Sequence, residues 1–324
     1  AYHSSLMAAL WAGLAQQRGD IPGRVLAETP ALPAHCGWLG YLRCHDDIGW
    51  NVLAREAAGD ARHAGYDLAA VDAFYAGERD GSWARGRRFQ SAGDDHVHGS
   101  NGMTAALAGI DAALEAGDAD ALAGAERRMR LLHAVMLACT GLPTLYMGDE
   151  IALGNDEDYA TDPARAGEGR WLQRPAMDWA LVEATEAAPA ADDAPVSRTA
   201  CAQRVHAALH ALLRARAALP ALRGDAPLQV LPQSEGALLC IARDGTGGRS
   251  DADSDAALSR SGRSAPAFLG LFNFGETACA LPALPPGAWQ DVLQPPYADN
   301  VTVPGHLQAH GFLWLRRVDD ATAT

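Results

Sequence analysis

Three consecutive residues, His45, Asp46 and Asp47, place an imidazole beside two carboxylates directly after a short apolar run. The run, 38–42, is bulky and is typical of a buried strand. In parallel α/β folds, the groups that do chemistry lie at the carboxyl ends of strands, where the chain enters a loop. The sequence therefore predicts a site here. The alternative is that one Asp merely caps a following helix, because Asp is a favoured N-cap residue.

The stretch 41–50 reads Tyr-Leu-Arg-Cys-His-Asp-Asp-Ile-Gly-Trp. It resembles the seventh-strand motif of the α-amylase superfamily (glycoside hydrolase family 13), in the form carried by amylosucrases and their sucrose-hydrolase relatives. The resemblance implies that Asp46 stabilises the transition state by accepting hydrogen bonds from hydroxyls of a glucosyl ring. It also implies that His45 binds the same ring and that Asp47 reaches toward the fructosyl side.

Two later stretches extend this resemblance in the expected order. Residues 141–150, Gly-Leu-Pro-Thr-Leu-Tyr-Met-Gly-Asp-Glu, are similar to the eighth-strand motif of the superfamily. Residues 170–179, Arg-Trp-Leu-Gln-Arg-Pro-Ala-Met-Asp-Trp, resemble an amylosucrase signature. In that family the first Arg forms a salt bridge that closes the bottom of the pocket, which implies this substrate-binding role for Arg170. The alternative is a solvated Arg in a loop.

Composition excludes several classes of function. The 324 residues carry 40 acidic and 26 basic side chains, a net charge of -14, with every basic residue an Arg. Such a chain has no electrostatic reason to bind nucleic acid or an anionic membrane, and no apolar run is long enough to span a bilayer. We therefore expect a neutral ligand such as a carbohydrate.

The cysteines and histidines give no clear metal site. None of the six cysteines forms a C-x-x-C pair, which favours free thiols in a reducing compartment, and we expect a cytoplasmic location. His96 and His98, beside Asp94 and Asp95, have the spacing of zinc ligands but lie in a Gly-rich stretch without a rigid frame. We expect no metal and no cofactor, because carboxylates would carry out the chemistry.

Periodicity predicts the organisation of the chain. Residues 4–18 and 121–139 are expected to be helices. In the second helix, the side chains expected to point inward are Leu131, Leu132, Val135 and Met136, and those expected to point outward are Arg127, Arg128 and Arg130. Residues 19–35 are expected to be a connection, and the segment after Trp50 a helix that continues to about residue 76. Tyr75 and Trp83 could stack on a sugar, but aromatic residues in loops more often pack beneath them.

From residue 228 onward, short apolar runs are separated by turn residues, a pattern that predicts antiparallel strands of a small β-sandwich. We expect an α/β fold: residues 1–224 form the C-terminal portion of a (β/α)8 TIM barrel, from the sixth to the eighth helix, and residues 225–324 form the β-sandwich. Residues 243–264 are expected to be a hairpin loop.

A retaining glycosidase also needs a carboxylate nucleophile and a carboxylic acid about 5 Å apart. In the superfamily these lie on the fourth and fifth strands, and neither is recognisable in this sequence. We therefore expect a catalytically incomplete part of an enzyme that transfers glucosyl from sucrose to an α-glucan. The alternatives are a sucrose hydrolase, whose acceptor is water, and a non-catalytic sugar-binding or assembly subunit.

Overall fold

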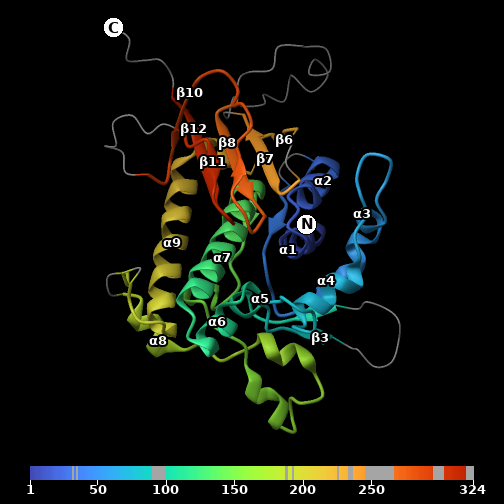
Figure 1. The fold of residues 1–324 in the computed structure, drawn as a ribbon, viewed down its shortest axis with the longest axis vertical. Helices are drawn as coiled ribbons and strands as arrows, with labels where there is room; N and C mark the ends of the chain where they lie inside the picture. Colours follow the sequence, from blue (N-terminus) through green and yellow to red (C-terminus); the bar gives the residue numbers. More distant parts are fainter. Residues whose placement is uncertain are drawn as a thin grey trace.

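The computed structural model describes residues 1–30, 33, 36–89, 99–186, 189–191, 193–224, 226–232, 236–244, 266–294 and 303–318. In Figure 1 an antiparallel sheet lies at one end of the molecule, the long helices α7 and α9 run alongside each other through the middle, and the irregular segment that follows residue 150 lies at the opposite end. The helices have the following bounds: α1 (Ser4–Gln16), α2 (Asp20–Glu28), α3 (Ala54–Ala58), α4 (Leu68–Tyr75), α5 (Thr104–Ala108), α6 (Ile110–Ala116), α7 (Ala119–Cys139), α8 (Trp179–Ala184) and α9 (Arg198–Ala218).

Two short parallel strands lie within the two segments that the sequence predicts to be strands. Strand β1 (Leu39–Gly40) pairs with β5 (Leu142–Pro143), and Tyr2 forms a further parallel bridge to Leu39. The expected strand over 141–150 is therefore much shorter than predicted. Among the described residues these parallel segments do not close into a barrel, and the Leu142 side chain, 59% exposed, has no strand over it. The observed fold is α/β with small open sheets.

The N-terminal helix follows its predicted pattern. Helix α1 begins where His3 Nδ1 accepts a hydrogen bond from the Leu6 backbone N–H, and it buries Leu10 and Leu14 in the main core. The connection expected over 19–35 instead contains α2, which packs on α1 and buries Ile21 and Val25. The Pro and Gly of this segment misled the prediction, because Pro22 lies in the first turn of the helix, where it is tolerated.

The helix expected after Trp50 is interrupted. The chain forms the 3₁₀ helix η1 (Trp50–Leu53), then α3, and only later α4. Gly59 ends α3 with φ +72, a left-handed conformation that favours glycine. Tyr75 and Trp83 are not free for stacking: Tyr75 is buried between Trp11 and Trp50, and Trp83 packs beneath an Arg side chain.

Helix α7 buries the apolar positions that the sequence indicates, but one of its Arg residues points inward. Arg128 is 8% exposed; its guanidinium lies 3.9 Å from the centre of the Trp83 ring and its Nε donates to the Ala108 carbonyl. The prediction that Arg128 points outward is therefore wrong. An aromatic face and a carbonyl supply the partners that make its burial tolerable.

The C-terminal strands form a five-stranded antiparallel sheet in the order β10-β12-β8-β7-β6. Alternate residues of β7 enter two different cores: Leu239 and Ile241 face the helices, whereas Leu238 and Cys240 face the small sheet β9-β11. Both faces of the large sheet are thus covered, one of them by helices rather than by a second large sheet. The strands have the following bounds: β6 (Leu228–Val230), β7 (Leu238–Arg243), β8 (Phe268–Asn273), β9 (Cys279–Ala280), β10 (Ala288–Asp291), β11 (His306–Leu307) and β12 (Phe312–Val318).

Two Arg side chains join this sheet to the helical part. Arg243 of β7 is 2% exposed and donates to the carbonyls of Ala138, Arg223 and Ala226. Arg216 of α9 donates to the carbonyls of Leu137, Thr140 and Gly141. The unpaired carbonyls at the end of α7 are thereby satisfied by positive groups. Residues from both sides of the expected boundary at 224/225 contribute to one hydrophobic core. The hairpin expected over 243–264 falls mostly outside the described residues.

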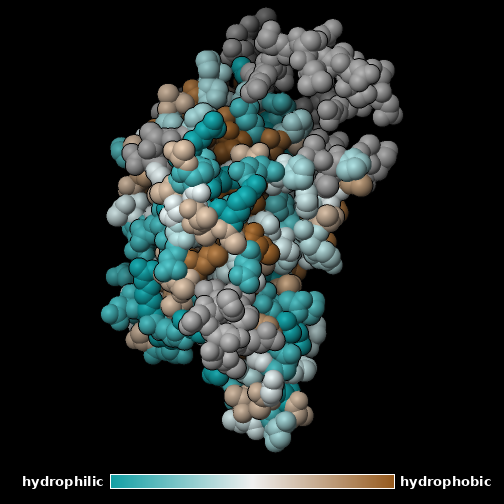
Figure 2. Space-filling view, turned by 90° about the vertical axis from the view of Figure 1, so that its right-hand side faces the viewer, coloured by the Kyte–Doolittle hydropathy of each residue, from teal (hydrophilic) through white to brown (hydrophobic). Residues whose placement is uncertain are grey.

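The surface is mixed in polarity. Figure 2 shows hydrophobic residues interspersed among hydrophilic ones on one face of the molecule. Among the described residues, no helix is both long enough and apolar enough to cross a membrane. In the described ranges, the large apolar side chains that remain exposed are Tyr2, Val52, Leu142, Trp179, Leu213 and Val318.

Candidate functional site

The residues His45, Asp46 and Asp47 lie in the loop between β1 and β2 (Ile48–Gly49), as the strand pattern predicts. The side chains of His45 and Asp46 are exposed, and His45 Nε2 lies 3.5 Å from Asp46 Oδ2. Asp47 is only 15% exposed. The first two side chains are therefore available to a ligand, whereas the third is held by the protein.

Arg170 reaches this loop from the 3₁₀ helix η4 (Gly169–Gln173), far along the chain. Its Nε and Nη2 lie 3.1 Å and 3.0 Å from Asp47 Oδ1, and its Nε lies 3.4 Å from Asp46 Oδ1. The guanidinium carbon is 4.2 Å from the centre of the Phe89 ring, a cation–π contact that fixes its plane. The structure thus brings together all four residues that the sequence singles out, and Arg170 is not a solvated Arg.

The backbone of the loop is also fixed. Arg43 Nη2 donates to the Asp46 carbonyl at 2.9 Å, and Arg174 Nε donates to the His45 carbonyl at 2.9 Å. Gly99 in β4 (Gly99–Asn101) allows Asp47 to approach closely, because a Cβ there would lie 2.7 Å from Asp47 Oδ2. Strands β2, β4 and β3 (Arg87–Phe89) form a small antiparallel sheet that supports one side of the loop.

A buried polar cluster supports the loop from below. Arg43 is 1% exposed and donates through Nε to the Gly102 carbonyl at 2.8 Å. Burial lowers the pKa of its guanidinium, while the nearby negative charges of Asp149 and Asp47 favour its charged form. Asp149 is itself buried, with Oδ2 lying 3.5 Å from His133 Nε2, and neither of its oxygens accepts a hydrogen bond within the described residues. The loop therefore rests on buried charges that partly compensate one another.

Sequence reasoning missed several of these groups. Arg174 lies 3.9 Å from Asp46 Oδ1 and holds the His45 backbone. Arg174 belongs to the same resembling stretch, 170–179, as Arg170, and this was a usable signal. Nothing in the local sequence marked Phe89 or the inward-facing Arg43. The candidate metal ligands His96 and His98 lie outside the described residues.

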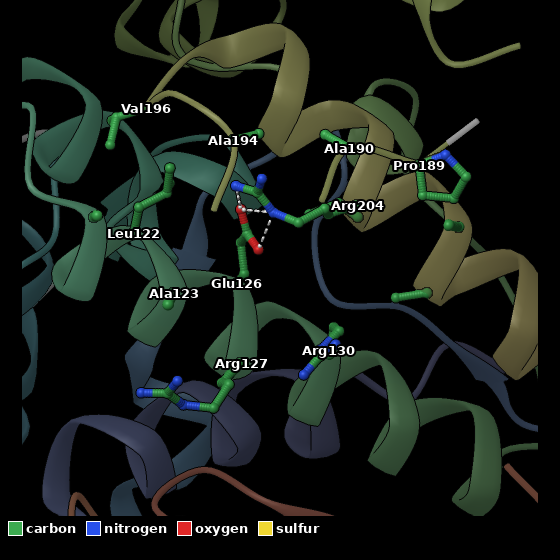
Figure 3. Close-up of a pocket in the computed structure, with 14 residues that line it drawn as sticks. Leu122, Ala123, Glu126, Arg127, Arg130, Pro189, Ala190, Ala194, Val196 and Arg204 are labelled. Atoms are coloured by element: carbon green, nitrogen blue, oxygen red, sulfur yellow. Dashed lines mark hydrogen bonds and ion pairs between the residues drawn. The ribbon is translucent and has the colours of Figure 1, made fainter. Parts of the chain in front are cut away.

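A separate cavity of about 550 Å³ lies between α7, α9 and the segment that precedes α9. Its lining includes Leu122, Val196 and several Ala residues, and none of the loop residues above contributes to it. Figure 3 shows Glu126 pointing toward Arg204, which donates to both of its carboxylate oxygens at 2.7–3.1 Å. Glu126 is the one acidic side chain among the described residues of the lining, and Arg204 engages its carboxylate, so these residues offer no pair of groups for acid–base chemistry.

No model of a known protein family matches the sequence. Several solved structures are similar to it in fold. Sucrose 6F-phosphate phosphorylase from Thermoanaerobacter thermosaccharolyticum has a TM-score of 0.50 and 14% identity, over 75% of this chain and 39% of that one. Pullulanase from Bacillus acidopullulyticus has a TM-score of 0.47 and 13% identity, over 98% of this chain and 30% of that one.

The first of these similarities shows that about three quarters of the chain shares the fold of that enzyme. At this level of identity the similarity shows a shared fold and no specific activity. Any assignment to the amylosucrase branch must rest on the residues of the site. The chain spans well under half the length of each of these two enzyme structures.

Proposed function

We propose that this chain supplies the sugar-binding strand ends of a sucrose-cleaving, retaining glucosyltransferase of the amylosucrase type. The observation that carries the proposal is the contact of Arg170 with Asp47 and Asp46, beside the exposed His45. This arrangement leaves one carboxylate and one imidazole available to a ligand, next to a guanidinium that bounds the site on one side.

The chemistry of a glucosyl ring suits these groups. His45 Nε2 and Asp46 Oδ2, 3.5 Å apart, can hydrogen-bond neighbouring hydroxyls of one pyranose ring. As the ring flattens toward an oxocarbenium ion, the hydroxyls become more acidic and their bonds to the Asp46 carboxylate strengthen. An interaction that is stronger in the transition state than in the ground state accelerates the reaction. Asp47 would contact the fructosyl side, and the glucosyl group would pass to an α-glucan.

The reaction also needs a nucleophile and a general acid about 5 Å apart, and the described residues around the loop do not offer them. The remaining carboxylates there are Asp47 and Glu168, which are both engaged by Arg170, and Asp149, which is buried beneath the loop. We propose that the missing strands and carboxylates come from further polypeptide, and that residues 1–324 alone are inactive. The open parallel strands, with Tyr2 72% and Leu142 59% exposed, support this proposal.

Sucrose turnover by the chain, extended upstream as its genome encodes, tests the proposal. The extended protein should release fructose and precipitate glucan, and Asp46→Asn should lower the rate of fructose release about 100-fold or more. Asp158→Asn, at an exposed position outside the site, is the matched control and should retain the wild-type rate.

The other outcomes separate the alternatives. Free glucose in place of glucan would indicate a sucrose hydrolase. An extended protein that binds sugar without cleaving sucrose would indicate a non-catalytic subunit. An extended protein that neither binds nor cleaves sugar would contradict the proposal, as would an Asp46→Asn variant with unchanged turnover.

A further inference from the structure

The loop that carries His45 and Asp46 also holds a thiol. Cys44, His45 and Asp46 each offer one ligand atom, and these atoms all lie within 4.8 Å of one another. Elsewhere in the described part of the chain, no other group of three Cys, His, Asp or Glu side chains comes as close together. The Cys44 side chain is partly exposed and the other two are exposed, so a solvated ion can reach all three.

We propose that this loop binds a zinc ion through Cys44 Sγ, a ring nitrogen of His45 and the Asp46 carboxylate. Proteins bind Zn²⁺ through thiolate, imidazole and carboxylate groups, usually in a tetrahedral arrangement. With three protein ligands bound, water takes the fourth position. Magnesium and calcium prefer oxygen ligands alone, so the thiol selects against them. On binding, the thiol proton of Cys44 passes to solvent and no electron is transferred.

The frame around the ligands is already in place. Arg43 and Arg174 hold the carbonyls of Asp46 and His45, each at 2.9 Å. The Asp46 backbone N–H lies 3.4 Å from Cys44 Sγ and holds the sulfur against the loop. A fixed backbone lowers the entropy that is lost when three side chains converge on an ion.

The charges around the loop permit a cation on one side of Asp46. Arg170 and Arg174 face Oδ1 of this carboxylate, at 3.4 Å and 3.9 Å, whereas Oδ2 faces the His45 ring. The ion would therefore take Oδ2 and leave Oδ1 to the guanidinium groups. With Cys44 ionised, five negative groups lie near the three guanidiniums of Arg43, Arg170 and Arg174: Cys44, Asp46, Asp47, Asp149 and Glu168. The guanidiniums weaken zinc binding without preventing it.

Zinc would occupy the same imidazole and carboxylate that the proposed function assigns to the glucosyl ring. Zinc and sugar would then exclude each other, and zinc would act as a competitive inhibitor. This consequence depends on the proposed function, whereas the metal site itself does not.

Cobalt(II) serves as the spectroscopic probe for the site in the reduced, metal-free chain. A thiolate bound to Co²⁺ gives a ligand-to-metal charge-transfer band in the near ultraviolet. Added Zn²⁺ should displace the Co²⁺ ion stoichiometrically and abolish this band. Cys44→Ser should abolish the band, and His45→Gln and Asp46→Asn should each weaken Co²⁺ binding by about tenfold or more. Cys36→Ser, which removes another cysteine that is exposed, is the control and should leave the band unchanged.

Failure of the metal site and failure of the proposed function have different signatures. Absence of the band, or a band that survives in Cys44→Ser, would overturn the metal site whatever the enzyme does with sucrose. A band that depends on all three residues establishes the site even if the extended protein does not cleave sucrose. In an active extended protein, Zn²⁺ should raise the apparent KM for sucrose at unchanged kcat, and Cys44→Ser should relieve the inhibition; zinc that lowers kcat alone would contradict mutual exclusion.

Discussion

Arg170 and Asp47 are separated by 123 residues in the chain, yet their side chains form a close ion pair in which two guanidinium nitrogens lie 3.1 Å and 3.0 Å from one carboxylate oxygen. The same guanidinium lies 3.4 Å from Asp46 and 4.2 Å from the Phe89 ring centre. One side chain therefore links a strand-end loop, the small sheet β2-β4-β3 and η4. The planar guanidinium of Arg suits this position better than the ammonium group of a Lys would, because it can donate to carboxylates and stack on an aromatic ring at once.

Replacing Arg170 with Lys keeps the positive charge but removes the fork and its stacking on Phe89. We expect kcat/KM for sucrose in the extended protein to fall about 100-fold, because the two carboxylates lose their fixed positions. Arg165→Lys is the matched control, because Arg165 also pairs with carboxylates but does so with Asp156 and Asp162, away from the loop. Equal losses in the two variants would show that Arg170 has no special part in the site.

Gly99→Ala should disturb the same ion pair from the opposite side. The added methyl group would lie 2.7 Å from Asp47 Oδ2 and 2.5 Å from the Ile48 carbonyl, so the loop must shift. We expect a loss of about 1–3 kcal/mol in the free energy of unfolding, measured by urea denaturation. In the neighbouring Gly49→Ala variant, the new Cβ meets nothing within 4 Å, and its stability should stay close to that of the wild type. Similar values for the two variants would argue against tight packing at Gly99.

Arg43→Leu should destabilise the fold through the charges that it leaves behind. Arg43 is buried, holds the carbonyls of Gly102 and Asp46, and lies near the buried Asp149. Removing one member of a buried charge cluster costs about 3–5 kcal/mol, because the remaining charge is left uncompensated. Arg62→Leu, at an exposed position, should change the urea midpoint little. A double variant, Arg43→Leu with Asp149→Asn, should be less destabilised than the sum of the two single variants.

We expect two buried histidines to lower the free energy of unfolding in mild acid. Burial lowers the pKa of His310 to about 3, assisted by the positive charges of Arg128 and Arg127, and burial lowers the pKa of His3 to about 4. Between these values and the unfolded value of about 6.5, the unfolded chain binds protons that the folded protein does not, so stability falls as the pH falls. From pH 7.5 to pH 5, each histidine should contribute about 2 kcal/mol to this loss.

His310→Asn isolates one of the two contributions. Residue 310 has φ +54, and Asn tolerates this left-handed conformation better than most residues. The free energy of unfolding of the variant, measured in urea at pH 7.5 and at pH 5, should fall by about 2 kcal/mol less than that of the wild type. An unchanged difference between the two pH values would show that His310 is not held neutral in the folded protein.

The sequence by itself determined much of this molecule through local patterns. Short apolar runs separated by turn residues located strands β7, β8 and β12, because a strand buried on both faces is apolar along its length. The helical period located α1 and α7, because packing against the core favours apolar residues at this spacing. The polar cluster at the end of the run 38–42 located His45, Asp46 and Asp47, because a chain that leaves a sheet exposes its polar groups there.

Only the tertiary structure decided which distant groups meet this cluster. Arg170, Arg174 and Arg43 converge on one loop from separate segments, and Arg128, expected on the surface, is buried against Trp83. These positions depend on partners far away in the sequence. A buried guanidinium is stable only where it contacts a carboxylate, a carbonyl or an aromatic ring. A local pattern records the charge of an Arg but not whether the fold provides that partner.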